Sequence, residues 1–210
     1  MRYTEIDIIK GVAVIFMIIF HVFYFPNQYG FKEIKYDTDT LKVIAKIAQI
    51  IFIISVGINL HLSKRSSLNK KETNEEYIQK SFKRIIKITI LAIFMSIFTK
   101  FIFGEKYVKF GILHFIAISS LLLFNFTDNK IIIQVLLVGC FFFHYLSLQN
   151  PNFFDAIPSK LSFILGFNKN YQSIDHFPLL PWIILILIGI LLGNILSDYK
   201  IKSIVNETDK

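Results

Sequence analysis

Long apolar stretches are the feature that most restricts how this chain can fold. Six stretches are long enough, or nearly so, to cross about 30 Å of hydrocarbon at about 1.5 Å per helical residue; they lie at residues 6–25, 41–62, 85–103, 108–126, 131–148 and 177–196. Of the 210 residues, 54% are hydrophobic and 18% are charged, so a water-soluble fold would have too little polar surface to cover the apolar side chains. The sequence therefore predicts an all-α, polytopic membrane bundle of about six transmembrane helices.

The connections between these stretches constrain the bundle further. Short polar links at 104–107 and 127–130 force the third, fourth and fifth stretches to run antiparallel. The longest connection, 149–176, contains an apolar run at 161–167 that is too short to span, so we expect an interfacial or re-entrant segment there. No small-residue cleavage site follows the first stretch, which therefore reads as a retained helix. We expect a single integral membrane domain over residues 1–210.

The net charge is +8, and its basic residues are distributed as membrane topology predicts and not on one nucleic-acid-binding face. If the amino terminus is cytoplasmic, most of the 23 Lys and Arg residues fall on that side, and a predicted loop at 63–84 contributes the largest share. Such a loop is expected to touch anionic lipid. The charge bias predicts cytoplasmic amino and carboxyl termini, with the lipid bilayer and not nucleic acid as a partner.

Ionisable residues within a membrane are costly, so they are the first place to look for function. Lys10 and His21 are eleven residues apart, which places them within about 20° of the same helix face and about 16 Å apart along the axis. Asp7 precedes Lys10 by three residues and can reach its ammonium group. The first helix thus carries a cation near the inner boundary and an imidazole in the outer leaflet.

Further titratable residues fall at the depth of the first-helix imidazole. In the predicted topology His114, His144 and His176 share nearly this level, and Asp175 adjoins His176. Such a grouping favours a functional site in the outer leaflet. Taken singly, His144 and also His61, at the inner end of the second stretch, are interpreted as hydrogen-bonded packing residues. For His176, anchoring at the membrane interface is an equal alternative.

Several other kinds of site are not indicated. The spacing lacks a His-Glu-x-x-His run, and Cys140 with His144 is the single i, i+4 pair of ligand type, so no metal is expected. One cysteine also excludes a disulfide scaffold. There is no phosphate loop, no dinucleotide fingerprint and no Gly-x-Ser-x-Gly elbow.

Three blocks of the sequence resemble a known family. RYTEIDIIKGVA at residues 2–13, followed by His21, is similar to the first-helix signature of transmembrane acyltransferases. GILH at 111–114 and SIDHFPLLPW at 173–182 are similar to two further blocks of the prokaryotic proteins grouped with the heparan-alpha-glucosaminide N-acetyltransferase catalytic domain. The blocks occur in the family's order and span nearly the whole chain.

The resemblance implies an O- or N-acetyltransferase. An acyl group, typically acetyl from cytoplasmic acetyl-CoA, would pass to a hydroxyl or amine of a sugar or other glycan on the far side of the membrane. The resemblance makes His21 the motif histidine, Lys10 its basic partner and Asp7 the preceding acid. On this hypothesis the catalytic residues are His21, His114 and Asp175, the acetyl-CoA-binding residues Lys10, Lys83 and Arg84, and the supporting residues Asp7 and His176.

Two other classes of protein are compatible with the same residues. A small multi-pass transporter could use the histidines to relay protons or line a substrate path, and a non-catalytic subunit could pack against a membrane partner. No inverted repeat is evident, which favours transfer over transport. Direct transfer and an acetyl-histidine intermediate both stay open, and an oligomer is compatible with the sequence.

Overall fold

The structure, a computed structural model, describes residues 4–28, 38–167 and 173–208. Arg2, in the first of the family-like blocks, lies outside these residues. Within them the chain is all-α and has no β-strand. The elements are α1 (Thr4–Gln28), α2 (Thr38–Asn69), α3 (Asn74–Phe103), η1 (Gly104–Lys106), α4 (Ile112–Leu123), α5 (Lys130–Gln149), η2 (Pro151–Phe154), α6 (Ser159–Leu165) and α7 (Leu179–Thr208).

Five helices, α1, α2, α3, α5 and α7, are long and apolar enough to cross a membrane among the residues described. Many of their outward side chains are large and apolar; Phe101 is 87% exposed and Ile131 73%. Contiguous exposed apolar surface of this kind is costly in water, whereas a helix with all its backbone hydrogen bonds made is stable in lipid. The predicted class, a polytopic helical membrane bundle, is confirmed.

One of the six predicted spans is shorter than expected. The helix predicted at 108–126 is α4, whose 12 residues give about 18 Å of helix. The chain before α4 is extended because the Phe177 N–H donates to the carbonyl of Phe110 at 2.9 Å, which pairs this segment with the approach to α7. The segment still returns the chain to the level of His61, since the carbonyl of Thr127 lies 2.8 Å from the His61 ring.

The loop predicted at 63–84 is mostly helical. α2 continues to Asn69 and α3 begins at Asn74, so only four residues connect them. A capping box explains the start of α3: Thr73 accepts from the Glu76 N–H, and the Glu76 carboxylate accepts from the Thr73 N–H. The polar ends of both helices thus project past the apolar stretches, which the hydropathy pattern alone does not reveal.

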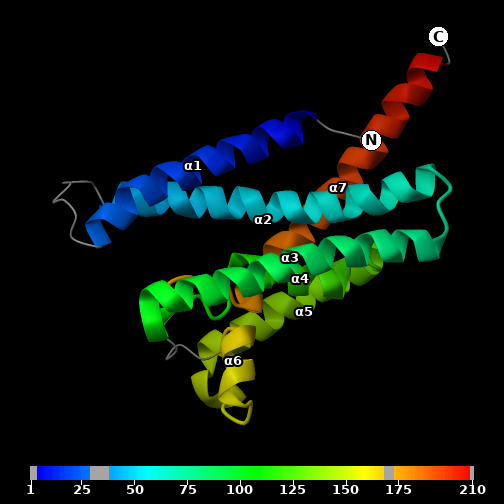
Figure 1. Cartoon of the computed structure of the whole chain (residues 1–210). Coiled ribbons are helices and arrows are strands. Elements are labelled where there is room, and N and C mark those ends of the chain that lie inside the picture. Colours follow the sequence, from blue (N-terminus) through cyan, green and yellow to red (C-terminus); the bar gives the residue numbers. More distant parts are fainter. Residues whose placement is uncertain (1–3, 29–37, 168–172, 209–210) are drawn as a thin grey trace.

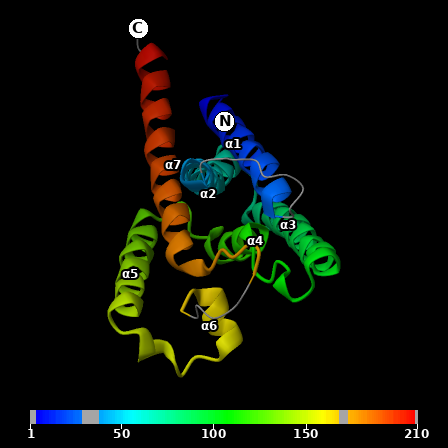
Figure 2. The same cartoon turned by 90° about the vertical axis from the view of Figure 1, so that its left-hand side faces the viewer.

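The successive helices α1, α2 and α3 run antiparallel, and α7 crosses α2 and packs against it (Figure 1). α1 lies along α2, α4 packs on α3, and α5 flanks α7 on the side away from α1 (Figure 2). The start of α1, the end of α7 and the α2–α3 turn lie at one end of the bundle, on the right in Figure 1. This end is called the Lys10 end below, and the opposite end the His21 end.

Glycines bring α2 and α7 into close contact at the centre of the bundle. A Cβ on Gly57 would collide with the carbonyl oxygen of Ile186, and one on Gly189 with the carbonyl oxygen of Ile54. Small residues allow such backbone approach between membrane helices, where packing drives association. The surrounding core includes the fully buried Ile53 and Leu187.

The connection between α5 and α7 contains only short helices in its described part. The apolar run predicted at 161–167 forms α6, which has seven residues and is too short to span a membrane. Phe163 of α6 is buried in the same core as α4 and α7. The short helix therefore packs beneath α4 and the start of α7, toward the bottom of Figure 2.

Candidate functional site

Asp175 lies at the amino terminus of α4. Its Oδ2 accepts a hydrogen bond from the Ile112 N–H at 3.1 Å. The carboxylate packs against Gly111, where an added Cβ would collide with it. The N–H groups of a helix amino terminus attract negative charge, so this contact fixes Asp175 beside the first turn of α4.

Burial and the neighbouring groups have opposite effects on the pKa of the Asp175 carboxyl group. Burial raises the pKa of Asp175, while the Ile112 N–H and the nearby His21 and His176 rings act to lower it. The predicted residues His21 and His176 therefore both act electrostatically on Asp175. A carboxylate next to an imidazole can orient the ring and stabilise its protonated form.

His21 projects from α1, where its orientation is fixed by its own helix. Nδ1 lies 2.6 Å from the carbonyl of Met17, and because a carbonyl can only accept, Nδ1 carries the proton. In the neutral ring, Nε2 is then the basic nitrogen. His21 lines a cavity of about 580 Å³ between α1, α2 and α4, called here the His21 cavity, whose lining is apolar apart from His21 and Gln49.

His114 differs from His21 because both its ring nitrogens bond to protein groups. The Gly111 N–H donates to Nδ1 at 3.4 Å, so Nε2 carries the proton in the neutral ring. Nε2 lies 3.2 Å from the hydroxyl of Ser96, which donates in turn to the carbonyl of Val108 at 2.6 Å. This chain joins α3 to the start of α4, so the geometry suits His114 to positioning the site.

His176 and His144 lie apart from this chain of bonds. The Nε2 of His176 lies 3.0 Å from the carbonyl of Phe163, and its ring stacks on the Phe163 ring at 4.0 Å. These contacts anchor α6 to the segment before α7. His144 is half-buried on α5, and its ring makes no hydrogen bond to any residue the structure describes.

A second cavity, of about 720 Å³, lies at the Lys10 end between α1, α2 and α3. We call it the basic cavity because Lys10, Lys70, Lys80, Lys83 and Arg84 line it, with Asp7 and Glu72 as its carboxylates. All three predicted cations, one from α1 and two from α3, thus line one cavity. Such a cluster of cations suits an anionic group such as a phosphate.

Ion pairs occupy only part of this positive charge. Lys10 pairs with Asp7 at 3.2 Å, and Lys80 with Glu72 at 2.5 Å. The hydrogen bond from Lys80, followed by that from Ser67, lowers the pKa of Glu72. Lys70 and Lys83 form no ion pair with any residue in the described part of the chain, so the cavity keeps an excess of positive charge.

Sequence reasoning did not assign Lys70 and Lys80 to this site. Both fall in the predicted loop 63–84, whose charges were sufficiently explained by membrane topology. The capping box at Thr73 is the signal that the segment is a tight helical turn. A tight turn brings both lysines back over the start of α1.

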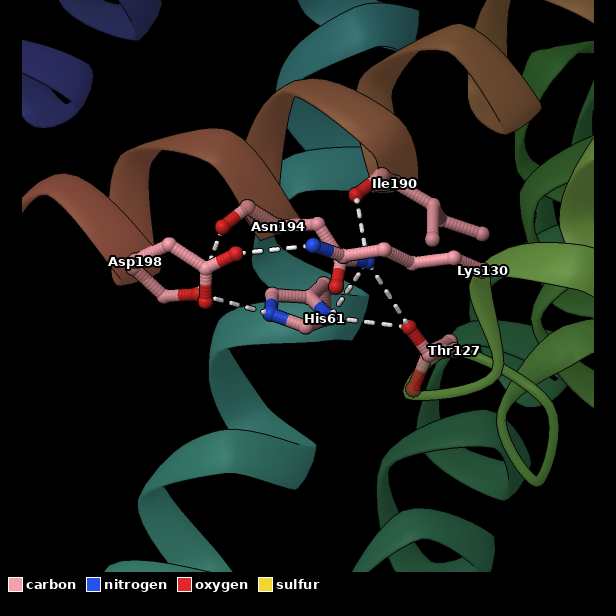
Figure 3. A network of polar contacts seen from close by, with 7 residues as sticks. His61, Thr127, Lys130, Ile190, Asn194 and Asp198 are labelled. Carbon is pink, nitrogen blue, oxygen red and sulfur yellow. Dashed lines mark hydrogen bonds and ion pairs between the residues drawn. The ribbon is translucent and has the colours of Figure 1, made fainter.

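His61 belongs to a buried polar network at the Lys10 end (Figure 3). Its Nδ1 lies 2.8 Å from the carbonyl of Thr127 and 3.1 Å from the Asn194 amide nitrogen, while Nε2 lies 3.1 Å from the Ser197 hydroxyl. The network joins α2 and α7 to the turn before α5. Its contacts fit the interpretation of His61 as a hydrogen-bonded packing residue.

The geometry offers no metal centre among the residues described, since no group of three or more His, Cys, Asp or Glu side chains gathers there. Cys140 is half-buried on α5. The predicted site residues instead lie toward the two ends of a membrane bundle, with Lys10, Lys83 and Arg84 at one end and His21, His114, Asp175 and His176 at the other. The class of protein is thus a helical membrane protein with a cation-lined cavity at one end and a histidine-lined cavity toward the other.

A comparison with known protein families identifies the family of this chain. The family described as "Heparan-alpha-glucosaminide N-acetyltransferase, catalytic" matches residues 2–209, essentially the whole length, and the chain belongs to this family. The match confirms the resemblance carried by the three sequence blocks and makes membrane acetyltransferase the kind of function the chain has. No curated protein and no solved structure matches the chain.

Proposed function

We propose that this protein transfers an acetyl group from acetyl-CoA, bound in the basic cavity, to a hydroxyl or amine of a sugar or glycan on the opposite side of the membrane. The observation that carries the proposal is that Lys10, Lys83 and Arg84 line one cavity at the end of α1 opposite to His21. Their cavity is roomy enough, at about 720 Å³, for the nucleotide part of CoA.

The two ends of acetyl-CoA match the two ends of α1. The phosphates of CoA would bind the cations of the basic cavity through charge-assisted hydrogen bonds. The acetyl thioester ends a long flexible arm, which would reach His21 about 16 Å further along the helix. One donor molecule would thus connect both sites without a moving carrier.

His21 is the proposed general base. Its Nε2 would take the proton from the acceptor hydroxyl or amine as the acceptor attacks the thioester carbon. The carbon–sulfur bond then breaks, and the CoA thiolate leaves and takes a proton. A route through acetyl-histidine uses the same residues, with Nε2 as the attacking atom.

Asp175 and His114 act on this base from the start of α4. Asp175 would stabilise the imidazolium form of His21, and His114 would hold the first turn of α4 in place through Gly111 and Ser96. Asp7 would orient Lys10, and His176 would fix the segment that carries Asp175. Residues 1–210 would act as one domain, with both termini in the cytoplasm.

The purified protein in detergent tests both ends of the site. Binding of labelled CoA should weaken about tenfold to a hundredfold in Lys10→Ala and Lys83→Ala, because each loses a charge-assisted hydrogen bond. Lys87→Ala is the matched control, since Lys87 is exposed on α3 and does not line the cavity. Unchanged CoA binding in both cavity variants would show that CoA does not bind in the basic cavity.

Transfer to candidate sugars tests the other end. His21→Ala should lower the transfer rate about a hundredfold to ten-thousandfold, the usual contribution of a general base, while CoA binding persists. A rate that survives substitution of His21, His114 and Asp175 alike would show that the reaction occurs elsewhere. Movement of an intact sugar or a proton without acetylation would instead support a transporter.

A further inference from the structure

Three cavities lie in series along α2. A middle cavity of about 280 Å³ shares Asn59 and Arg84 with the basic cavity, and shares Phe52 and Leu113 with the His21 cavity. A series of adjacent cavities, called the route below, therefore extends from the cations at one end to His21 at the other.

The lining of this route changes from charged to apolar. The middle cavity has few polar side chains, and the His21 cavity has only His21 and Gln49. Apolar side chains offer few hydrogen-bonding partners to the polar groups of a bound ligand. Any amide or carbonyl within it therefore depends on the few polar side chains present.

Two amide side chains on α2 make no hydrogen bond within the described part of the chain. They are Gln49, in the His21 cavity, and Asn59, where the basic and middle cavities meet. Both residues are half-buried on a helix that crosses the membrane. Unpaired amides are costly there, because lipid supplies no partner.

Asn194 is an amide side chain in the same bundle whose hydrogen bonds are made within the protein. Its Nδ2 lies 3.1 Å from the His61 ring, 3.3 Å from the carbonyl of Thr127 and 3.3 Å from that of Ile190. Gln49 and Asn59 have no such partners among the residues described and instead line cavities. Hydrogen bonding to a bound ligand explains these two amides better than a role in helix packing does.

We infer that Gln49 and Asn59 hydrogen-bond the arm of the acyl-CoA donor as it passes through the three cavities. Asn59 contacts the arm near the diphosphate, and Gln49 contacts it beside the thioester. Ten residues separate the two positions, about 15 Å along α2, so they meet opposite ends of an extended arm and not adjacent groups. The inference rests on the proposed function and adds two positioning residues to it.

The test compares two ligands that differ by the arm. CoA carries the arm, and 3′-phospho-ADP, written ADP below, has the same adenosine, 3′-phosphate and diphosphate without it. Binding of CoA to Gln49→Leu should weaken about fivefold to tenfold, as expected for one lost hydrogen bond, and ADP binding should stay unchanged. Asn59→Leu should give the same result. Gln134→Leu on the exposed face of α5 is the matched control and should bind both ligands normally.

A steric variant tests the route itself. Val56 lines only the middle cavity, so Val56→Trp should block CoA while ADP still binds in the basic cavity. ADP binding also reports that each variant is folded. CoA affinities within twofold of wild type in Gln49→Leu, Asn59→Leu and Val56→Trp would overturn the inference alone. A wild-type protein that binds no CoA would overturn the proposed function with it.

Discussion

Gly111 permits the contact on which the proposed acid–base site depends. Its lack of a side chain lets the Asp175 carboxylate reach the Ile112 N–H, and an added Cβ would collide with both Asp175 and Val108. The site residues on either side of this contact come from segments more than sixty positions apart in the chain.

Gly111→Ala should therefore separate Asp175 from the start of α4. We expect acetyl transfer to fall about a hundredfold, the cost of misplacing a catalytic group by roughly 1 Å, with CoA binding retained. Transfer and CoA-binding assays on the same preparation measure both effects. A fully active Gly111→Ala protein would show that the Asp175 contact is not needed.

Asp175→Asn should change stability and activity in opposite directions. Burial raises the pKa of Asp175, so the folded protein holds this proton more tightly than the unfolded chain. Its contribution to stability is greatest at acidic pH and declines as pH rises from the unfolded-state pKa through the folded-state pKa. Ionisation of Asp175 is thus less favourable in the folded protein than in the unfolded chain.

We expect Asp175→Asn to melt at a higher temperature than wild type at neutral pH and to lose this advantage at acidic pH. Acetyl transfer should fall about a hundredfold at neutral pH, because a neutral amide cannot stabilise an imidazolium. Thermal melting in detergent at several pH values measures the first effect. A variant that is less stable than wild type at neutral pH would contradict the expected sign.

Some of this site was predictable from the residues and some was not. The eleven-residue spacing of Lys10 and His21 places one at each end of the bundle, as helix geometry requires. The bonded state of His114 was not predictable, because its partner Ser96 comes from another helix. Gln49 was equally hidden, since only the packing shows that it faces a cavity.

At the scale of elements, the crossing of α2 and α7 depends on two glycines. Gly57→Ala and Gly189→Ala each place a methyl group against a backbone carbonyl of the other helix, which cannot move as a side chain can. We expect each variant to lose about 1–3 kcal/mol or more of stability, the usual cost of overpacking. Gly139→Ala on α5 meets no atom within 4 Å and should be neutral. Unfolding in detergent measures all three, and equal stability would contradict the close crossing.

The polar network around His61 joins three elements at the Lys10 end. Asn194→Leu would leave the carbonyl of Thr127 and the His61 ring with fewer partners in a buried site, so stability should fall by about 1–3 kcal/mol. Asn125→Leu, at an exposed position in the neighbouring turn, is the control. A stability loss equal to that of the control would show that the network does not stabilise the bundle.

Element boundaries were harder to predict than the elements themselves. Apolar length correctly predicted α1, α2, α3, α5 and α7, because lipid exposure requires long apolar helices. It overestimated α4, whose start is set by backbone pairing between Phe110 and Phe177 and not by hydropathy. It also missed the polar ends of α2 and α3, which project beyond the apolar stretches.

On the scale of the whole molecule, the basic cavity and the His21 cavity lie toward opposite ends of the bundle. The cations of the basic cavity lie at the end formed by the start of α1 and the α2–α3 turn, and His21 with Asp175 lies toward the other. A single-site enzyme in water would have no reason for this separation. It is the arrangement expected if the donor enters from one side of a membrane and the acceptor from the other.

Acetyl transfer across a sealed membrane tests this account most directly. Proteoliposomes would contain candidate sugars inside and receive acetyl-labelled acetyl-CoA outside, where it reaches the molecules whose Lys10 end faces outward. We predict labelled sugar inside wild-type vesicles and none inside His21→Ala vesicles. Label that appears equally in both, or that reaches only sugars supplied on the same side as acetyl-CoA, would contradict transfer across the membrane.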